Sequence, residues 1–296
     1  MTFSDKLDAS IQKNTSLLCV GLDSDVKMLP RHVESETYPQ FTFNKAIIDA
    51  THDLVCAYKP NSAFYEALGA AGITELKMTC DYLHQSYPEI PIILDAKRGD
   101  IGSTNEGYVT YAFDYLGVDA ITLHPYLGRE ALQPFLDRKD KGCIILCKTS
   151  NPGGGEFQDL ALDTGSAFVA KSTSAKGANQ AIKLYQFVAQ NVSRKWNTNG
   201  NCMLVVGAPY PEELAIVRRI VGDMTLLVPG IGTQGGDVER IVKAGVNSKG
   251  AGMIINASRS VIFADSGTDF PQKARNEALK LRDRINVFRI KTYDRT

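Results

Sequence analysis

Short apolar runs that end in polar residues alternate along the chain with segments whose apolar positions recur at helical spacing. Such runs are typical of buried strands, and the alternation predicts parallel strands joined by helices. We expect strands at residues 16–23, 53–59, 90–97, 118–124, 142–149, 201–207, 224–229 and 250–256. We expect helices at residues 4–12, 41–51, 74–85, 104–115, 128–136, 175–192, 211–221 and 236–244, with a closing helix from Pro271.

Eight strand–helix units fit either a (β/α)8 TIM barrel or a doubly wound open sheet. Nearly every run ends in Asp, Lys, His, Thr or Asn, and only a barrel gathers all these ends around one mouth, so the pattern favours the barrel. The step between the fifth and sixth runs is long and needs an insertion. We therefore predict one α/β barrel domain over residues 1–296, with an N-terminal helix at its closed end and a C-terminal helix packed through Leu281, Ile285 and Phe288.

Composition and charge exclude several classes of partner. The 296 residues contain 33 Lys plus Arg and 33 Asp plus Glu, so the formal net charge is zero. Such a chain has no overall basic field for a nucleic-acid polymer or an anionic membrane, and no apolar run is long enough to span a bilayer. The N-terminus lacks the pattern of a secretory signal, so we expect a cytoplasmic protein. The six cysteines form no C-x-x-C pair, which predicts buried, reduced thiols without a metal.

The most informative motif is D-x-K-x-x-D, formed by Asp95, Lys97 and Asp100 at the end of a predicted buried strand. Asp95 and Lys97 are two residues apart, so on a regular strand they share one face, here the inner face of the barrel mouth. Asp100 follows in the loop, where Thr104 can cap the next helix. A structural interpretation is a salt bridge that fixes the strands, but residues at carboxyl strand ends more often serve function in barrels.

Two further strand ends contribute charge, Asp23 after the first run and Lys59 after the second. Together with the D-x-K-x-x-D motif they predict an array of alternating carboxylates and ammonium groups. A lysine between carboxylates stays protonated, because nearby negative charge favours its charged form. Such a lysine can act as a general acid, whereas a Schiff-base lysine needs a depressed pKa.

A glycine-rich segment at residues 230–236 formally matches G-x-G-x-x-G after a strand. A dinucleotide site also needs an acidic residue about twenty positions later, and residues 250–258 contain none. We instead predict a phosphate cradle from the loops after the last two strands, completed by Arg259. In the alternative interpretation, the glycines only turn the chain and Arg259 pairs on the surface.

Two other strand ends have open interpretations. Residues 148–153 combine hydroxyl and amide groups with a glycine-rich loop, which could read the polar edge of a planar ligand or could serve only as a turn. His124 ends the fourth run, where a hydrogen-bonded structural histidine is a commoner explanation than a catalyst.

Taken together, these segments resemble the orotidine 5′-phosphate decarboxylase family. The resemblance rests on DAKRGDIGST around Asp95 to Thr104, on Asp23 and Lys59, and on the late PGIGTQGGD and SRS segments. The form DAKRGDIGST and the stretch VVGAPYPEEL resemble the longer variant group of that family. D-x-K-x-x-D alone also occurs in sugar-phosphate decarboxylases and synthases of the same superfamily, whereas the order of all the segments is specific.

The resemblance implies decarboxylation of orotidine 5′-monophosphate to UMP in pyrimidine biosynthesis, by a homodimer with a shared active site and without metal or other cofactor. It implies that Lys97 protonates C6 and that Asp95 lies beside the departing carboxylate. It also implies catalytic roles for Lys59 and Asp100, with Asp100 and Thr104 reaching into the partner subunit's site. The implied substrate-binding residues are Lys59 and Asp23 at the ribose, Ile101 and Thr104, Ser150 at the pyrimidine edge, and Gln234 and Arg259 at the phosphate.

Two other functions remain open from the residues. One is a magnesium-dependent sugar-phosphate lyase of the same superfamily. The other is a non-catalytic nucleotide-binding barrel, against which the intact Asp95, Lys97 and Asp100 argue.

Overall fold

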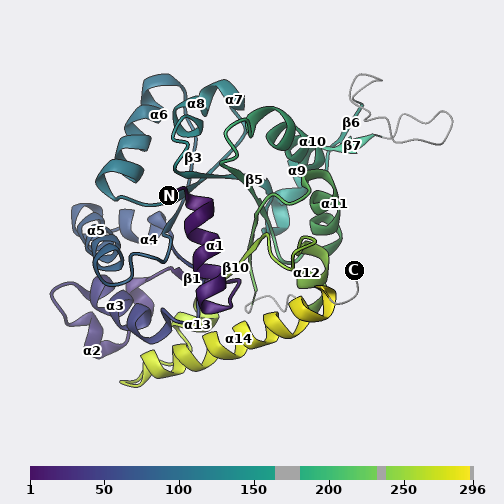
Figure 1. The fold of residues 1–296 in the computed structure, drawn as a ribbon. Helices are drawn as coiled ribbons and strands as arrows, with labels where there is room; N and C mark the ends of the chain where they lie inside the picture. The colour runs from purple at the N-terminus through teal and green to yellow at the C-terminus, as the bar shows by residue number, and fades with distance from the viewer. Residues whose placement is uncertain (164–180, 232–237, 294–296) are drawn as a thin grey trace.

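The computed structural model describes residues 1–163, 181–231 and 238–293. Within these ranges, eight parallel strands form a nearly closed barrel surrounded by helices (Figure 1), which confirms the predicted TIM barrel. The strands are β1 (Leu18–Leu22), β2 (Ala57–Pro60), β3 (Ile93–Arg98), β4 (Ala120–Leu123), β5 (Gly142–Lys148), β8 (Cys202–Val206), β9 (Leu226–Pro229) and β10 (Met253–Ala257).

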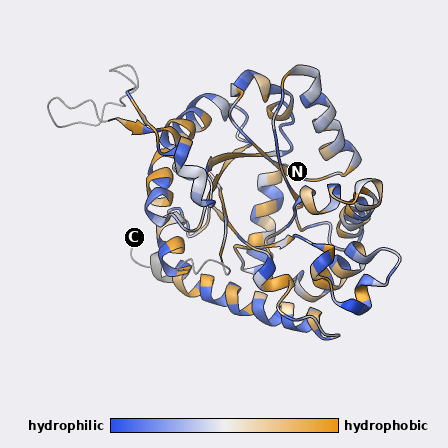
Figure 2. Cartoon of the chain, turned by 180° about the vertical axis from the view of Figure 1, so that it is seen from behind, coloured by the Kyte–Doolittle hydropathy of each residue, from blue (hydrophilic) through white to orange (hydrophobic). Residues whose placement is uncertain are grey.

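The strands lie in the order β2-β1-β10-β9-β8-β5-β4-β3. β2 and β3 are the first and last strands in this order. Two parallel bridges, Tyr58 to Ile92 and Asn61 to Asp95, connect these two edges and bring the barrel close to closure. Most strands are buried along their whole length, as expected for a parallel sheet covered on both faces. Figure 2 shows hydrophobic residues along the barrel strands and hydrophilic residues on the outer sides of the helices.

Helices connect the strands and cover the barrel. Their bounds are α1 (Phe3–Asn14), α2 (Arg31–Glu34), α3 (Pro39–Thr51), α4 (Ser62–Glu66), α5 (Gly69–Ser86), α6 (Gly102–Val109), α7 (Gly128–Ala131), α8 (Gln133–Leu136), α9 (Gly155–Gln158), α10 (Leu184–Asn191), α11 (Pro211–Val221), α12 (Val238–Gly245), α13 (Arg259–Ile262) and α14 (Phe270–Tyr293). Short 3-10 turns cover Val26–Met28 and Pro152–Gly154, and π-helical turns extend α6 over Thr110–Tyr115 and α10 over Val192–Trp196. No described helix has the length and apolar character needed to cross a membrane.

The N-terminal helix α1 covers the amino ends of the strands, as predicted. The backbone N–H of Phe3 donates to the carbonyl of Asp140 just before β5, and Lys6 pairs with Asp119 just before β4 at 2.8 Å. At the other end of the chain, α14 lies across the outside of the barrel (Figure 1), where Ile285 is fully buried. The charged mouth therefore opens on the side away from α1.

One predicted helix begins too early. Residues 175–180 lie outside the described residues, and Ile182–Lys183 form strand β7, which pairs antiparallel with β6 (Ala161–Leu162). Helix α10 begins at Leu184, where Gln186 accepts a hydrogen bond from the backbone N–H of Lys183. The apolar spacing around residue 182 therefore reflects a short hairpin in the long β5–β8 connection.

Candidate active site

A cavity of about 380 Å³ opens at the carboxyl ends of the strands. Its lining includes Lys59 from β2, Asp95 and Lys97 from β3 and Thr122 from β4. The loop after β5, including Ser150, lines it as well. The cavity therefore brings together residues from several strands at the mouth predicted from the polar strand ends.

The most buried charged side chain that lines this cavity is Lys59. Lys59 is only 2 % exposed, and its Nζ donates to Asp95 Oδ2 at 2.9 Å. Burial opposes the charge on Lys59, but the carboxylates of Asp95 and Asp23 outweigh that effect and raise its pKa above the ordinary value. Lys59 is therefore a fixed, buried positive charge in the wall of the cavity.

The second oxygen of Asp95 is held by Lys97, whose Nζ donates to Asp95 Oδ1 at 2.7 Å. Burial opposes ionisation of Asp95, but the charges of Lys59 and Lys97 outweigh it and hold the pKa of this carboxyl well below its ordinary value. The side chain of Lys97 is 48 % exposed, unlike that of Lys59. An ammonium has three donor hydrogens, so Lys97 can donate to a ligand while it keeps Asp95.

The backbone around Lys97 departs from the regular strand that the sequence predicted. Lys97 adopts φ 48°, and the pairing of β3 with β4 shifts register between Leu94 and Arg98. A positive φ is rare in residues other than glycine and costs of order 1–3 kcal/mol. The irregular strand still turns the side chain of Lys97 toward Asp95 and the cavity.

Thr122 stabilises this irregular backbone, although no motif in the sequence pointed to it. Its Oγ1 donates to Asp95 Oδ1 at 2.9 Å and accepts from the backbone N–H of Lys97 at 2.9 Å. Thr122 lies on β4 just before the polar strand end at His124, but its role depends on a contact with Asp95, 27 positions earlier, which no local sequence pattern shows.

Asp23 follows β1 at the same rim and is half-buried. Its Oδ1 atom is buried and receives no hydrogen bond from the described residues. A buried carboxylate oxygen without a partner is costly, which makes it an acceptor suited to a ligand hydroxyl.

The predicted residues Asp100, Ile101 and Thr104 do not line the cavity of their own chain. Asp100 Oδ1 accepts from the backbone N–H of Ile101 at 2.8 Å, and both Ile101 and Thr104 are exposed. His124 Nε2 lies 2.9 Å from the carbonyl oxygen of Gly99, which agrees with a structural histidine. The array predicted from sequence is thus assembled around Asp95, and Asp100 is not among the residues that line the cavity.

The predicted phosphate side is described only in part. Gly230 adopts φ 101° at the end of β9, a turn that favours glycine. Arg259 is exposed at the start of α13, directly after β10. Gln234 lies outside the described residues, so its predicted role is untested.

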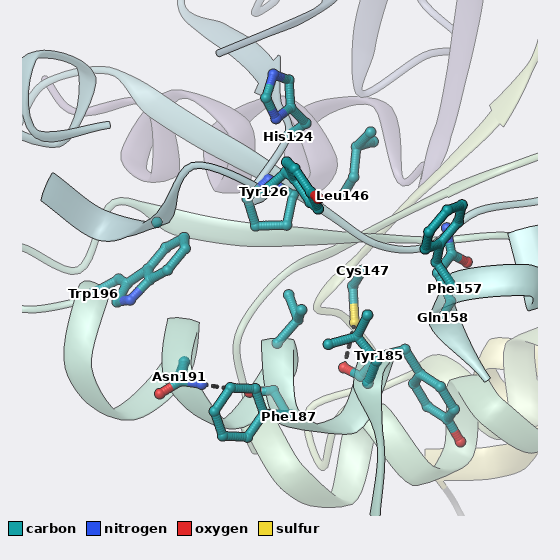
Figure 3. Close-up of a pocket in the computed structure, with 14 residues that line it drawn as sticks. His124, Tyr126, Leu146, Cys147, Phe157, Gln158, Tyr185, Phe187, Asn191 and Trp196 are labelled. Carbon is teal, nitrogen blue, oxygen red and sulfur yellow. Dashed lines mark hydrogen bonds between the residues drawn. The ribbon is translucent and has the colours of Figure 1, made fainter. Parts of the chain in front are cut away.

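A second hollow, of about 650 Å³, lies between β5 and α10 (Figure 3). Its walls are largely apolar and include Leu146, Phe187 and Trp196, and among the described residues that line it there is no Lys, Arg, Asp or Glu. Although it is larger than the cavity around Asp95, its described lining offers no ammonium or guanidinium group to an anionic ligand. Leu146 lines both spaces.

All six cysteines are buried and unpaired, as predicted. Across the described ranges, no three His, Cys, Asp or Glu side chains gather in a group that could hold a metal ion.

Comparison with known proteins gives consistent matches over this barrel. The model of the orotidine 5′-phosphate decarboxylase / HUMPS family matches residues 16–269. An orotidine 5′-phosphate decarboxylase of Janthinobacterium sp. (strain Marseille) is 49 % identical over 288 residues, covering 97 % of this chain and 99 % of the relative. The structure of Leishmania donovani OMP decarboxylase is 37 % identical, with a TM-score of 0.78, and covers 98 % of this chain and 99 % of that chain. Leishmania donovani UMP synthase is 39 % identical, with a TM-score of 0.81, over 98 % of this chain and 57 % of that chain.

Proposed function

Because the chain belongs to the orotidine 5′-phosphate decarboxylase / HUMPS family, we propose that it converts orotidine 5′-monophosphate to UMP and CO₂ in pyrimidine biosynthesis. The observation that best supports this reaction is the carboxylate of Asp95 held between the buried ammonium of Lys59 and the accessible ammonium of Lys97. The site thus places a fixed anion and a proton donor side by side in one cavity.

In the proposed reaction, Lys97 is the general acid. The bond between C6 of the pyrimidine and the carboxyl carbon breaks, CO₂ leaves, and the electron pair stays on C6. Nζ of Lys97 then transfers a proton to C6, and the neutral amine regains a proton from solvent. A preorganised ammonium stabilises negative charge where it develops, without reorganisation during the reaction. In this arrangement, Asp95 lies beside the departing carboxylate.

The other predicted residues bind the parts of the nucleotide that do not react. Lys59 and Asp23 are assigned to the ribose hydroxyls, and the Oδ1 of Asp23, which receives no hydrogen bond from the described part of the chain, supports that role. Ser150, which lines the same cavity, is assigned to the pyrimidine edge. Gln234 and Arg259 are assigned to the phosphate, whose binding energy can be used to orient the reacting end.

We also propose that the active enzyme is a homodimer with a shared site. Ile101 is 61 % exposed, and Tyr126 and Leu127 on the loop after β4 are exposed as well. The contact of His124 with Gly99 brings these two loops to the same rim. An apolar rim of this kind suits a second copy of the chain, and Asp100, Ile101 and Thr104 then extend toward the partner's cavity.

The proposed reaction needs no metal or other cofactor, which separates it from a magnesium-dependent sugar-phosphate lyase. The test is the absorbance change of orotidine 5′-monophosphate on conversion to UMP, with and without excess EDTA. We expect equal rates in both conditions. Turnover of a sugar phosphate that EDTA abolishes, or nucleotide binding without any UMP formed, would contradict the proposal.

A further inference from the structure

Lys148, the last residue of β5, is buried to 1 % exposure although the proposed reaction does not use its charge. Its Nζ donates to Asp159 Oδ2 at 2.7 Å. The same ammonium lies 4.8 Å from the ring centroid of Tyr210 and 5.8 Å from that of Tyr185. The hydrogen bond from Lys148 lowers the pKa of Asp159. The ion pair therefore joins β5 to the segment after α9, and the ring contacts of Lys148 add helix α10 and the loop after β8.

The loop between these two charges begins with the residues of the cavity wall. Thr149 follows Lys148 directly, and Gln158 precedes Asp159 directly. The side chain of Gln158 accepts from the backbone N–H of Thr149 at 2.9 Å and donates to Thr149 Oγ1 at 2.8 Å. Thr149 Oγ1 in turn donates to Asn151 Oδ1 at 2.6 Å. Two adjacent pairs thus clamp both ends of the loop that contains Ser150.

The barrel side of the same loop is tightly packed. A Cβ atom on Gly207, after β8, would lie 2.7 Å from Ser150 Cα and 2.8 Å from Ser150 Cβ. The backbone N–H of Gly207 also donates to the carbonyl of Lys148 at 2.7 Å. Ser150 therefore rests on Gly207 from one side and is held by the Lys148–Asp159 clamp from the other.

We propose that Lys148 is a positioning residue, which through its ion pair with Asp159 sets the place of Ser150 at the pyrimidine edge of the substrate. The proposal rests on the proposed function of the cavity and adds a specificity device to it. A buried ammonium needs its counter-ion, because an unpaired buried charge is strongly unfavourable. The buried ammonium of Lys148 therefore keeps its contact with Asp159, and this contact fixes the loop that contains Ser150.

The decisive variant is Lys148→Met, which keeps most of the side-chain volume and removes the charge. A group that holds the base contributes equally to the ground state and the transition state, so its loss raises KM and spares kcat. We expect KM for orotidine 5′-monophosphate and the Kd of UMP to rise about 30-fold, as for loss of a well-placed hydrogen bond, with kcat changed less than about fivefold. A purely structural role would instead lower the active fraction and leave KM unchanged.

Lys183→Met is the matched control. Lys183 contacts the other oxygen of Asp159 at 3.3 Å but is 46 % exposed, so this variant should keep KM within about twofold of wild type. A second route to the same effect is Gly207→Ala, which displaces Ser150 from the barrel side and should also raise KM. If Lys148→Met fails to fold, Asp159→Asn, which removes the negative charge beside Lys148, replaces it. We then expect Asp159→Asn and Gly207→Ala each to raise KM for orotidine 5′-monophosphate.

A double-mutant cycle with Ser150→Ala completes the experiment. Ser150→Ala should weaken UMP binding in the wild type and have little further effect when combined with Lys148→Met, because the serine is then already displaced. Equal effects of Ser150→Ala in both backgrounds, or a KM of Lys148→Met equal to that of Lys183→Met, would overturn the proposal. Wild-type turnover of orotidine 5′-monophosphate tests the proposed function itself, so failure of either one is distinguishable from failure of the other.

Discussion

Lys97 Nζ lies 2.7 Å from Asp95 Oδ1 although the backbone of Lys97 is left-handed, with φ 48°. The pair therefore depends on an irregular end of β3, which the hydroxyl of Thr122 holds through one bond to each residue. Backbone strain of this kind persists only where surrounding contacts enforce it, and it is concentrated at functional sites.

Replacing Thr122 should show that the contact between Lys97 and Asp95 depends on its hydroxyl. Thr122→Val keeps the shape of the side chain but leaves the backbone N–H of Lys97 and one acceptor position of Asp95 without a partner. Because such a loss costs about 2 kcal/mol, we expect kcat to fall about 30-fold, measured with saturating orotidine 5′-monophosphate. Thr122→Ser keeps the hydroxyl and is the control. A Thr122→Val enzyme as active as the serine variant would show that this hydroxyl does not hold the site.

The pair of Lys59 and Asp95 should dominate local stability. Lys59→Met leaves the buried Oδ2 of Asp95 without its counter-ion, so we expect the free energy of unfolding in urea to fall by about 3 kcal/mol. The control is Lys280→Met, since Lys280 lies 3.8 Å from Glu277 and is 76 % exposed, and its loss should cost less than about 0.5 kcal/mol. Similar losses in both variants would contradict the buried pairing.

The same pair predicts a pH dependence. The pKa of Asp95 is lowered, so its contribution to stability is complete above the unfolded value of about 4 and is lost as the pH falls below it. The pKa of Lys59 is raised, so its contribution is complete below about 10.4 and is lost as the pH rises through the folded value. The difference in unfolding free energy between wild type and Asp95→Asn should stay constant between about pH 5 and 9 and shrink below about pH 4. Shrinkage already near neutral pH would argue against a lowered Asp95 pKa.

Much of the barrel was predictable because buried parallel strands have continuous apolar runs with polar ends. The pairing of Asp95 with Lys97 was also anticipated, but from a regular strand that the protein does not have. Thr122 and Asp159 escaped detection because their roles depend on contacts distant in sequence. Thr122 reaches Asp95 across 27 positions. The start of α10 was misplaced because the spacing of two residues in a short hairpin resembles part of a helix.

Subunit mixing tests the shared site. Asp100→Ala and Lys97→Ala chains should each be inactive alone. If Asp100 completes the partner's site, a mixed dimer has one site without either change, and equal mixing should restore about a quarter of wild-type activity. No recovery after demonstrated exchange of subunits would contradict a shared site.

The central claim, that Lys97 gives its proton to C6, is tested most directly by the rate at which Lys97→Ala decarboxylates orotidine 5′-monophosphate. UMP binding by calorimetry verifies that the variant is folded and that its cavity is intact. We expect the rate to fall by at least about 1,000-fold, as for loss of a general acid that also stabilises developing charge, while UMP still binds. Decarboxylation within tenfold of the wild-type rate would contradict the assignment of Lys97 as the acid.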